Sequence, residues 1–335
     1  MSSLGLGDGA RLQLLQQDGA RLHDDLQRLT AELSSGQRAD LGRATGGDFT
    51  PLADLGRSLR LTETFARTIA DAGLAASARQ SALGRVEAEL DGMAPRLLGL
   101  ATGGSLQDMT LAVADAGDRL DQVVTALNTR LAGAALFAGN APDRPALAPA
   151  GDMLAQLRPI AAAAPTAQAL VDAVDDWFLA PGGGFETDAW SGGPEGLAPA
   201  ILGEGVAVQT GITARQPALR EVMAGLALAA LAAEGAGPAG EADRRALVSA
   251  AALRLEHGEE ALIRLRSDLG QSEARIEEAR AATEAARSTL ETETARLTGA
   301  DPYSTATELE SVEGRLEALY LLTARLSRLS LSEYL

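Results

Sequence analysis

The stretch RLQLLQQDGARLHDDLQRLTAELSSG, residues 11–36, decides how this chain folds. Leucines recur along it at alternating steps of three and four residues, with one interruption at Gly19. That spacing puts them on one stripe of an α-helix, as at the a and d positions of a coiled coil. The run Ser34–Ser35–Gly36 predicts the end of this helix.

The C-terminus repeats the spacing from Leu309 to Ser330. Leaving a leucine exposed forfeits about 1.5–3 kcal/mol, so both stripes must find partners. A lone pair of helices this short is marginal. We therefore expect residues 4–33 and 309–335 to be mobile in the single molecule and ordered on assembly. The predicted assembly interface is Leu12, Leu15, Leu22, Leu26, Leu29, Leu33, Leu309, Val312, Leu316, Leu319, Leu326, Leu329, Leu331, Tyr334 and Leu335.

The same spacing runs more weakly through residues 55–90, and a further stripe runs through residues 262–297. The second lies in a predicted helix from Glu241 to Leu297, which at 1.5 Å per residue would be about 85 Å long. A further helix is predicted over residues 105–136, and Gly299–Ala300–Asp301–Pro302 predicts a helix stop followed by a new start. Helices of this length suit a bundle or an assembly.

The middle of the chain differs in composition, because ten of the 13 prolines fall between Pro142 and Pro238 and would interrupt long helices there. Residues 155–179 and 218–233 are typical of helices, whereas alternation over 206–212 and 185–189 favours strands. The predicted fold is mainly α: a long antiparallel helical bundle or coiled coil built from both chain ends, with a small inserted mixed α/β domain. Its predicted domains are a terminal coiled coil (1–45 and 300–335), a helical rod (46–139 and 241–299) and a variable insert (140–240).

Composition excludes several functions. The 335 residues include 46 acidic and 29 basic side chains, all of the latter arginine, for a net charge of −17. This charge repels nucleic acid. Zero cysteine and two histidines exclude thiol chemistry and histidine-rich metal sites. Residues 1–10 lack the pattern of a Sec signal peptide, and the apolar run 222–233 is too short to span a bilayer.

Two histidine-containing clusters are better explained as solvated helix faces than as metal or acid–base sites. His23, Asp24 and Asp25 are consecutive, so their side chains diverge on a helix. His257 and Glu260 lie one turn apart, but two ligands alone make a weak metal site.

The insert also offers only weak signs of chemistry. The run 182–184 resembles a phosphate loop but lacks a following Gly-Lys-Ser/Thr, so a hairpin turn is the better interpretation. Glu186 and Asp188 are the nearest candidates for a carboxylate pair. Trp177, Phe178 and Trp190 could form a ligand platform, but we expect them to form the core of the insert. No catalytic residue, cofactor site or metal site is predicted.

Three segments resemble the flagellin superfamily, and within it the hook–filament junction proteins. Leu33–Ser34–Ser35–Gly36 with Arg38 is similar to the family's Leu-Ser-Ser-Gly-x-Arg turn. Leu127–Asn128 with residues 133–139 is similar to the segment that enters the family's variable domain. The ending 324–335, which closes in Tyr-Leu, is similar to junction proteins rather than to filament flagellins.

The resemblance implies a structural, non-enzymatic subunit that joins the bacterial flagellar hook to the filament. It further implies type III export to the extracellular flagellum without a cleaved signal peptide. The implied partners are copies of the chain in a ring, a neighbouring hook-associated protein, flagellin and an export chaperone, but no nucleic acid or membrane. The alternatives are a filament flagellin, a cytoplasmic coiled-coil scaffold and a hydrolase carried in the insert.

Overall fold

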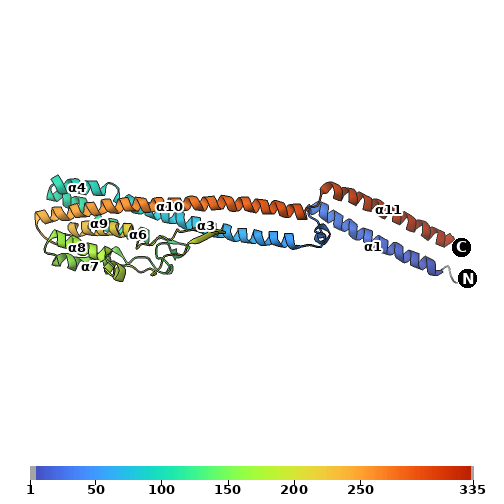
Figure 1. The fold of residues 1–335 in the computed structure, drawn as a ribbon, viewed down its shortest axis with the longest axis horizontal. Helices are drawn as coiled ribbons and strands as arrows, with labels where there is room; N and C mark the ends of the chain where they lie inside the picture. The colour runs from blue at the N-terminus through green and yellow to red at the C-terminus, as the bar shows by residue number, and fades with distance from the viewer. Residues whose placement is uncertain (1–4, 333–335) are drawn as a thin grey trace. The chain divides into compact units, whose positions relative to one another are not determined.

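The computed structural model describes residues 5–332, and these are mostly helical (Figure 1). The predicted mainly-α bundle with a small strand content is confirmed. Contacts divide the chain into two compact units, residues 1–63 with 285–335 (unit 1) and residues 64–284 (unit 2). The finer division into three domains stays a prediction. No helix among the described residues has the length and apolar character needed to cross a membrane.

Unit 1 contains the two ends of the chain. Its helices are α1 (Gly5–Ser35), the single turn α2 (Leu41–Ala44), the start of α3 (Thr50–Leu90), the end of α10 (Glu241–Thr298) and α11 (Pro302–Ser332). The predicted stops after Ser35 and Thr298 are confirmed, because both helices end there.

Unit 2 holds the remaining elements, with the rest of α3 and α10. Two short antiparallel hairpins, β1 with β2 and β3 with β4, are its strands. The elements are α4 (Met93–Gly103), α5 (Leu106–Val113), α6 (Ala116–Leu127), β1 (Arg130–Leu131), β2 (Ala134–Ala135), α7 (Ala150–Ala163), α8 (Ala167–Leu179), the π-helical turn η1 (Phe185–Ala189), β3 (Ala200–Gly203), β4 (Val206–Val208) and α9 (Pro217–Ala233).

Helix α9 is the centre of unit 2. It is buried at every position from Val222 to Leu231, and α5, α6, α7 and α8 all contact it. A helix that is apolar on all sides is stable only when it is surrounded. The apolar run at 222–233 is therefore a core helix.

Glycines bring α9 and α10 unusually close. A Cβ atom added at Gly258 of α10 would lie 2.9 Å from both the backbone nitrogen and Cγ2 of Val222, and one added at Gly225 would lie 2.9 Å from two side-chain atoms of Leu255. At these two glycines the backbone of one helix therefore lies directly against the other helix. Any side chain at either position would push α9 and α10 apart.

Helices α3 and α10 run antiparallel within unit 2. Gly73 of α3 faces Ile276 and Arg280, and further along α3 Glu87 forms an ion pair with Arg266. The contacts show the antiparallel direction, because higher residue numbers on α3 lie beside lower residue numbers on α10.

The helix predicted over residues 105–136 is wrong in its extent. The structure has two helices, α5 and α6, followed by the β1–β2 hairpin. Asn128 ends α6, and its side-chain amide both donates to and accepts from the backbone of Leu147. The chain then turns through Ala132 and Gly133, which both have positive φ. A tertiary hydrogen-bond partner thus ends a helix that periodicity alone would extend.

Four predictions for the insert are also corrected. The helix over 155–179 is two helices, α7 and α8, because Thr166 caps the second by accepting from the Ala169 N–H. The strand over 206–212 is confirmed only for Val206–Val208, because a turn bond from the Ile212 N–H to the Thr210 carbonyl follows it.

The predicted strand at 185–189 is a π-helical turn, closed by a 2.7 Å bond from the Trp190 N–H to the Phe185 carbonyl. Phe185 and Ala189 are its buried residues, one turn apart. Residues 182–184 lead into this turn and form no hairpin. Trp177 and Phe178 are buried with Phe185, and Trp190 is partly buried.

We expect Gly258→Ala to lower the free energy of unfolding by about 1–3 kcal/mol, because the new methyl group overlaps the backbone of Val222. Gly270→Ala in the same helix is the matched control, because nothing lies within 4 Å of its Cβ position. The control should gain up to about 1 kcal/mol from helix propensity. Guanidinium unfolding followed by circular dichroism measures both. Equal effects of the two substitutions would show that α9 and α10 tolerate separation.

Asp175 on α8 is a half-buried carboxylate among like charges. Burial raises its pKa, and the nearby carboxylates of Asp172, Asp176 and Glu221 raise it further, while its ion pair with Arg254 lowers it. One carboxylate oxygen is buried without a hydrogen bond. Because the folded pKa lies above the unfolded one, this group favours folding fully at low pH, and that contribution is lost as the pH rises through the folded pKa.

Asp175→Asn should therefore raise the free energy of unfolding at pH 7, where the native carboxylate is ionised. The gain should shrink as the pH falls through the raised pKa, because the native side chain then becomes neutral as well. Unfolding midpoints of both proteins between pH 7 and pH 4 measure the difference. A pH-independent difference, or a loss of stability at pH 7, would show that the Arg254 ion pair dominates.

Candidate functional site: the terminal helix pair

Helices α1 and α11 lie side by side and antiparallel, so the start of α1 and the end of α11 lie at the same end of the pair (Figure 1). Leu29 of α1 and Val312 of α11 are buried between them. Gly19, which interrupts the leucine spacing, leaves room for Leu319, whose Cδ2 would lie 3.6 Å from an added Cβ. The predicted pairing of the two ends is thus observed within one molecule.

The fifteen predicted interface residues divide by exposure. Leu33 is exposed, at 41% of its surface. The backbones of Leu12, Leu326, Leu329 and Leu331 lie in described helices, and Tyr334 and Leu335 lie outside the described residues. Besides the buried Leu29 and Val312, partly buried positions are Leu15, Leu22, Leu26, Leu309, Leu316 and Leu319. One partner helix therefore covers this stripe only in part.

A backbone bridge closes the base of the helix pair. The Arg38 N–H donates to the Thr298 carbonyl at 2.8 Å, and the Ala300 N–H donates to the Gly36 carbonyl at 3.0 Å. Gly36 has a φ of 68°, a conformation that favours glycine. The Arg38 guanidinium adds a 3.1 Å bond to the Gly299 carbonyl. The Leu-Ser-Ser-Gly-x-Arg turn is thus the point where the end of α1 is hydrogen-bonded to the turn that precedes α11.

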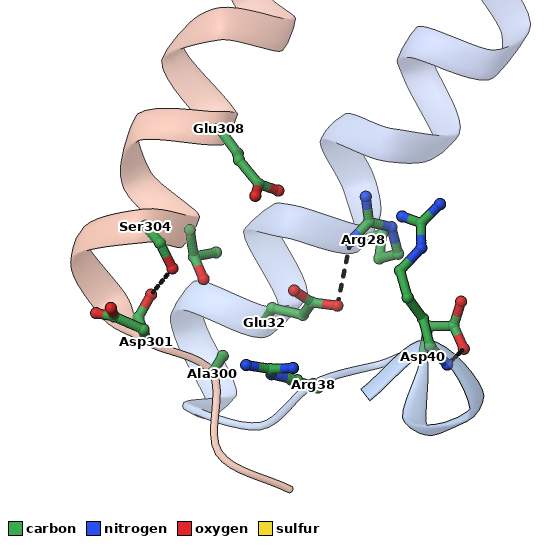
Figure 2. Close-up of a pocket in the computed structure, with 10 residues that line it drawn as sticks. Arg28, Glu32, Arg38, Asp40, Ala300, Asp301, Ser304 and Glu308 are labelled. Atoms are coloured by element: carbon green, nitrogen blue, oxygen red, sulfur yellow. Dashed lines mark hydrogen bonds and ion pairs between the residues drawn. The ribbon is translucent and has the colours of Figure 1, made fainter. Parts of the chain in front are cut away.

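A polar pocket of about 190 Å³ sits beside this bridge, between α1, the segment 38–43 and the start of α11 (Figure 2). Glu32 is 7% exposed, and its carboxylate accepts from Arg28 at 3.3 Å and from the Ala39 N–H at 3.0 Å. A hydrogen bond to Asp25 raises the pKa of Arg28, and Glu32 raises it further against the opposing effect of burial. Glu32 therefore holds the end of α1 to the chain that follows it.

The sequence did not reveal Glu32 as a functional residue. Its spacing of four from Arg28 is an ordinary helix pair. Its more informative partner, the Ala39 N–H, becomes a neighbour only because the chain reverses at Gly36. Figure 2 shows Glu308 of α11 pointing towards this pocket from the opposite helix.

The candidate chemical clusters do not converge. His23 is exposed and bonds Gln27, and Glu260 pairs with Arg264 rather than with His257. Glu186 pairs with Arg215 and accepts from the Gly182 N–H, and these bonds lower its pKa, the backbone bond most. Within residues 5–332, no group of three or more His, Cys, Asp or Glu side chains could hold a metal ion.

Large apolar side chains remain on the surface of the helix pair. Tyr303 is 83% exposed and Leu321 is 68% exposed, and Leu14, Tyr320 and Leu322 are also exposed. Surface of this kind on a pair of terminal helices favours contact with another protein. Fold and site together define a mainly helical protein whose two terminal helices pair and leave apolar side chains exposed.

Comparison with known proteins finds two similarities. Residues 255–335 match the family model of the bacterial flagellin C-terminal helical region. A solved structure from Vibrio parahaemolyticus, described as a flagellar hook-associated protein, shares the fold at a TM-score of 0.51 and 15% sequence identity. That match covers 73% of this chain and 95% of the other. None of the curated proteins matches. The C-terminal quarter of the chain is thus similar to the flagellin C-terminal helical region, and the fold is similar to that of a flagellar hook-associated protein.

Glu32→Ala should loosen the base of the helix pair by about 1–3 kcal/mol, because it leaves the Ala39 N–H without an acceptor and removes one partner of Arg28. Amide hydrogen exchange over residues 36–39 and 298–305 should accelerate. The control is Asp24→Ala, an exposed position on the same helix that should change little. Unchanged exchange in the Glu32 variant would show that the backbone bridge alone closes the pair.

Proposed function

We propose that this protein is a structural subunit of the bacterial flagellum, joining hook to filament by stacking its terminal helices against those of neighbouring subunits. The observation that carries the proposal is the α1–α11 pair, whose leucine stripe is only partly covered and whose outer surface exposes Tyr303 and Leu321. The match of residues 255–335 to the flagellin C-terminal region supports the flagellar role. The ending 324–335, similar to that of junction proteins, supports the junction role.

Of the fifteen predicted interface residues, those that are not buried in the single molecule are proposed to become buried in the assembled structure. A single pair of helices about 30 residues long is marginally stable, so part of the ordering of both ends would accompany assembly. The proposed partners are further copies in a ring, a neighbouring hook-associated protein and flagellin. The proposed export route is the flagellar type III apparatus, without a cleaved signal peptide and with a chaperone that covers the C-terminal stripe beforehand.

Filament flagellin is the second candidate, and the match to the flagellin C-terminal region favours it. Polymerisation of the purified chain separates the two. A flagellin would form long filaments by itself, whereas a junction subunit would form at most a short ring.

Electron microscopy of a strain that is motile until the gene for this protein is deleted tests the junction role. We expect intact hooks without filaments and filament protein shed into the medium, because the hook would offer no surface that filament subunits can join. Restoring the gene should restore filaments. Filaments of normal length in the deletion strain would exclude the junction role.

A chain truncated after Leu329 should keep unit 2 folded but fail to enter the flagellum, because it loses the last part of the C-terminal stripe. Circular dichroism of the purified chain checks the fold, and immunogold labelling of flagella checks incorporation. Normal incorporation of the truncated chain would remove residues 330–335 from the assembly surface.

A further inference from the structure

The outer surface of α11 carries a segregated stripe of charge. Glu310, Glu313, Glu317, Leu321 and Arg325 follow one another at steps of three or four residues, which places them on one face of the helix. All five are exposed, whereas Val312 on the α1 side is 8% exposed. We call these five residues the outer stripe. It is acidic at its start, apolar at Leu321 and basic at its end, and in the sequence Arg328 continues the spacing.

The charges of the outer stripe have no ion-pair partners among the described residues. Some surface arginines elsewhere do pair within their own helix, as Arg287 does with Glu291 and Arg296 with Glu293 at 2.8 Å in α10. The three glutamates of the outer stripe instead neighbour one another, and like charges at this spacing weaken a helix. Glu310 lies in the third turn, beyond the reach of the favourable helix N-terminus. The arrangement therefore costs α11 stability without a gain inside the molecule.

The two ends of the outer stripe cannot satisfy each other within one chain. Glu313 and Arg325 are twelve residues apart on a single helix, about 18 Å at 1.5 Å per residue. A second, parallel copy displaced by that distance along the helix axis would bring the Arg325 end of one α11 against the glutamates of the other. Because each copy offers both ends, such a contact repeats from copy to copy. A local basic segment also offsets the repulsion between chains of net charge −17.

We infer that α11 of one copy docks the Arg325 end of its outer stripe against Glu310, Glu313 and Glu317 of a parallel neighbour, with the exposed Leu321 inside the contact. The parallel direction rests on the proposed function, because subunits stacked around one flagellar axis share a direction. An antiparallel pair would also bring glutamates opposite Arg325, but it closes at two copies.

Cysteine cross-linking tests the contact cleanly, because the chain has no cysteine of its own. The variant Glu313→Cys/Arg325→Cys is produced in motile cells in place of the natural chain, and isolated flagella are oxidised. The two cysteines lie too far apart on one helix for a disulfide within the chain. A staggered parallel contact predicts a ladder of three or more linked copies on a non-reducing gel. An antiparallel contact predicts dimers that stop there and would overturn the inference.

Asp24→Cys/Arg325→Cys is the control pair, with the first exposed cysteine moved to α1. We expect far weaker cross-linking from it. Thiol labelling of the flagella shows that each variant is incorporated. An incorporated Glu313→Cys/Arg325→Cys chain that gives no ladder, or a control that gives an equal one, would overturn the inference.

Charge exchange provides a second measurement. Glu313→Arg and Arg325→Glu should each reduce incorporation severalfold, and the double exchange should restore most of it. Normal incorporation of both single variants, or no recovery in the double, would contradict the contact. Absence of the natural chain from flagella would instead contradict the proposed function, so the two failures are distinguishable.

Discussion

The hydrogen bonds between residues 36–38 and 298–300 are the interaction on which the rest of the structure depends. The bond from the Arg38 side chain to the Gly299 carbonyl joins positions 261 residues apart in the sequence, and the two backbone bonds lie beside it. Without them, the end of α1 would have no fixed relation to the turn before α11, and the two leucine stripes would not be in register. Glu32 reinforces the bridge from α1 by accepting from the chain just beyond it. A few polar contacts thus decide where a long apolar contact begins.

Unit 2 is held by a different kind of contact. Its centre, α9, is apolar on all sides and lies against backbone of α10 at Gly258. Close approach of this kind leaves little room for adjustment, because protein cores are packed as densely as crystals. The surroundings of Asp175 are less well optimised. This half-buried carboxylate lies beside other carboxylates, an arrangement that disfavours its charged form.

Much of the fold could be predicted from the sequence, because the helical spacing persists over many turns in α1, α3, α10 and α11. Where a pattern covers only five residues, as at 185–189, it fits a strand and a helical turn equally well, and only packing decides. The break at Asn128 depends on Leu147, a partner that local spacing does not contain.

The same distinction between local patterns and contacts between distant residues applies to the candidate site. The leucine stripe is a local pattern that the sequence itself predicts, whereas the bond from the Ala39 N–H to Glu32 exists only after the chain reverses. The outer stripe of α11 became visible once the structure showed which face α1 occupies.

The division of the chain into one continuous and one discontinuous unit has a kinetic consequence. Residues 64–284 contain all of unit 2, so this unit can form as soon as that length of chain is free. Unit 1 needs both termini, and closing so large a loop costs entropy that grows with its length. Prior folding of unit 2 shortens that loop to the residues between unit 2 and the two ends of the bridge. A chain that starts out unfolded and extended would therefore fold unit 2 first and pair its two terminal helices last.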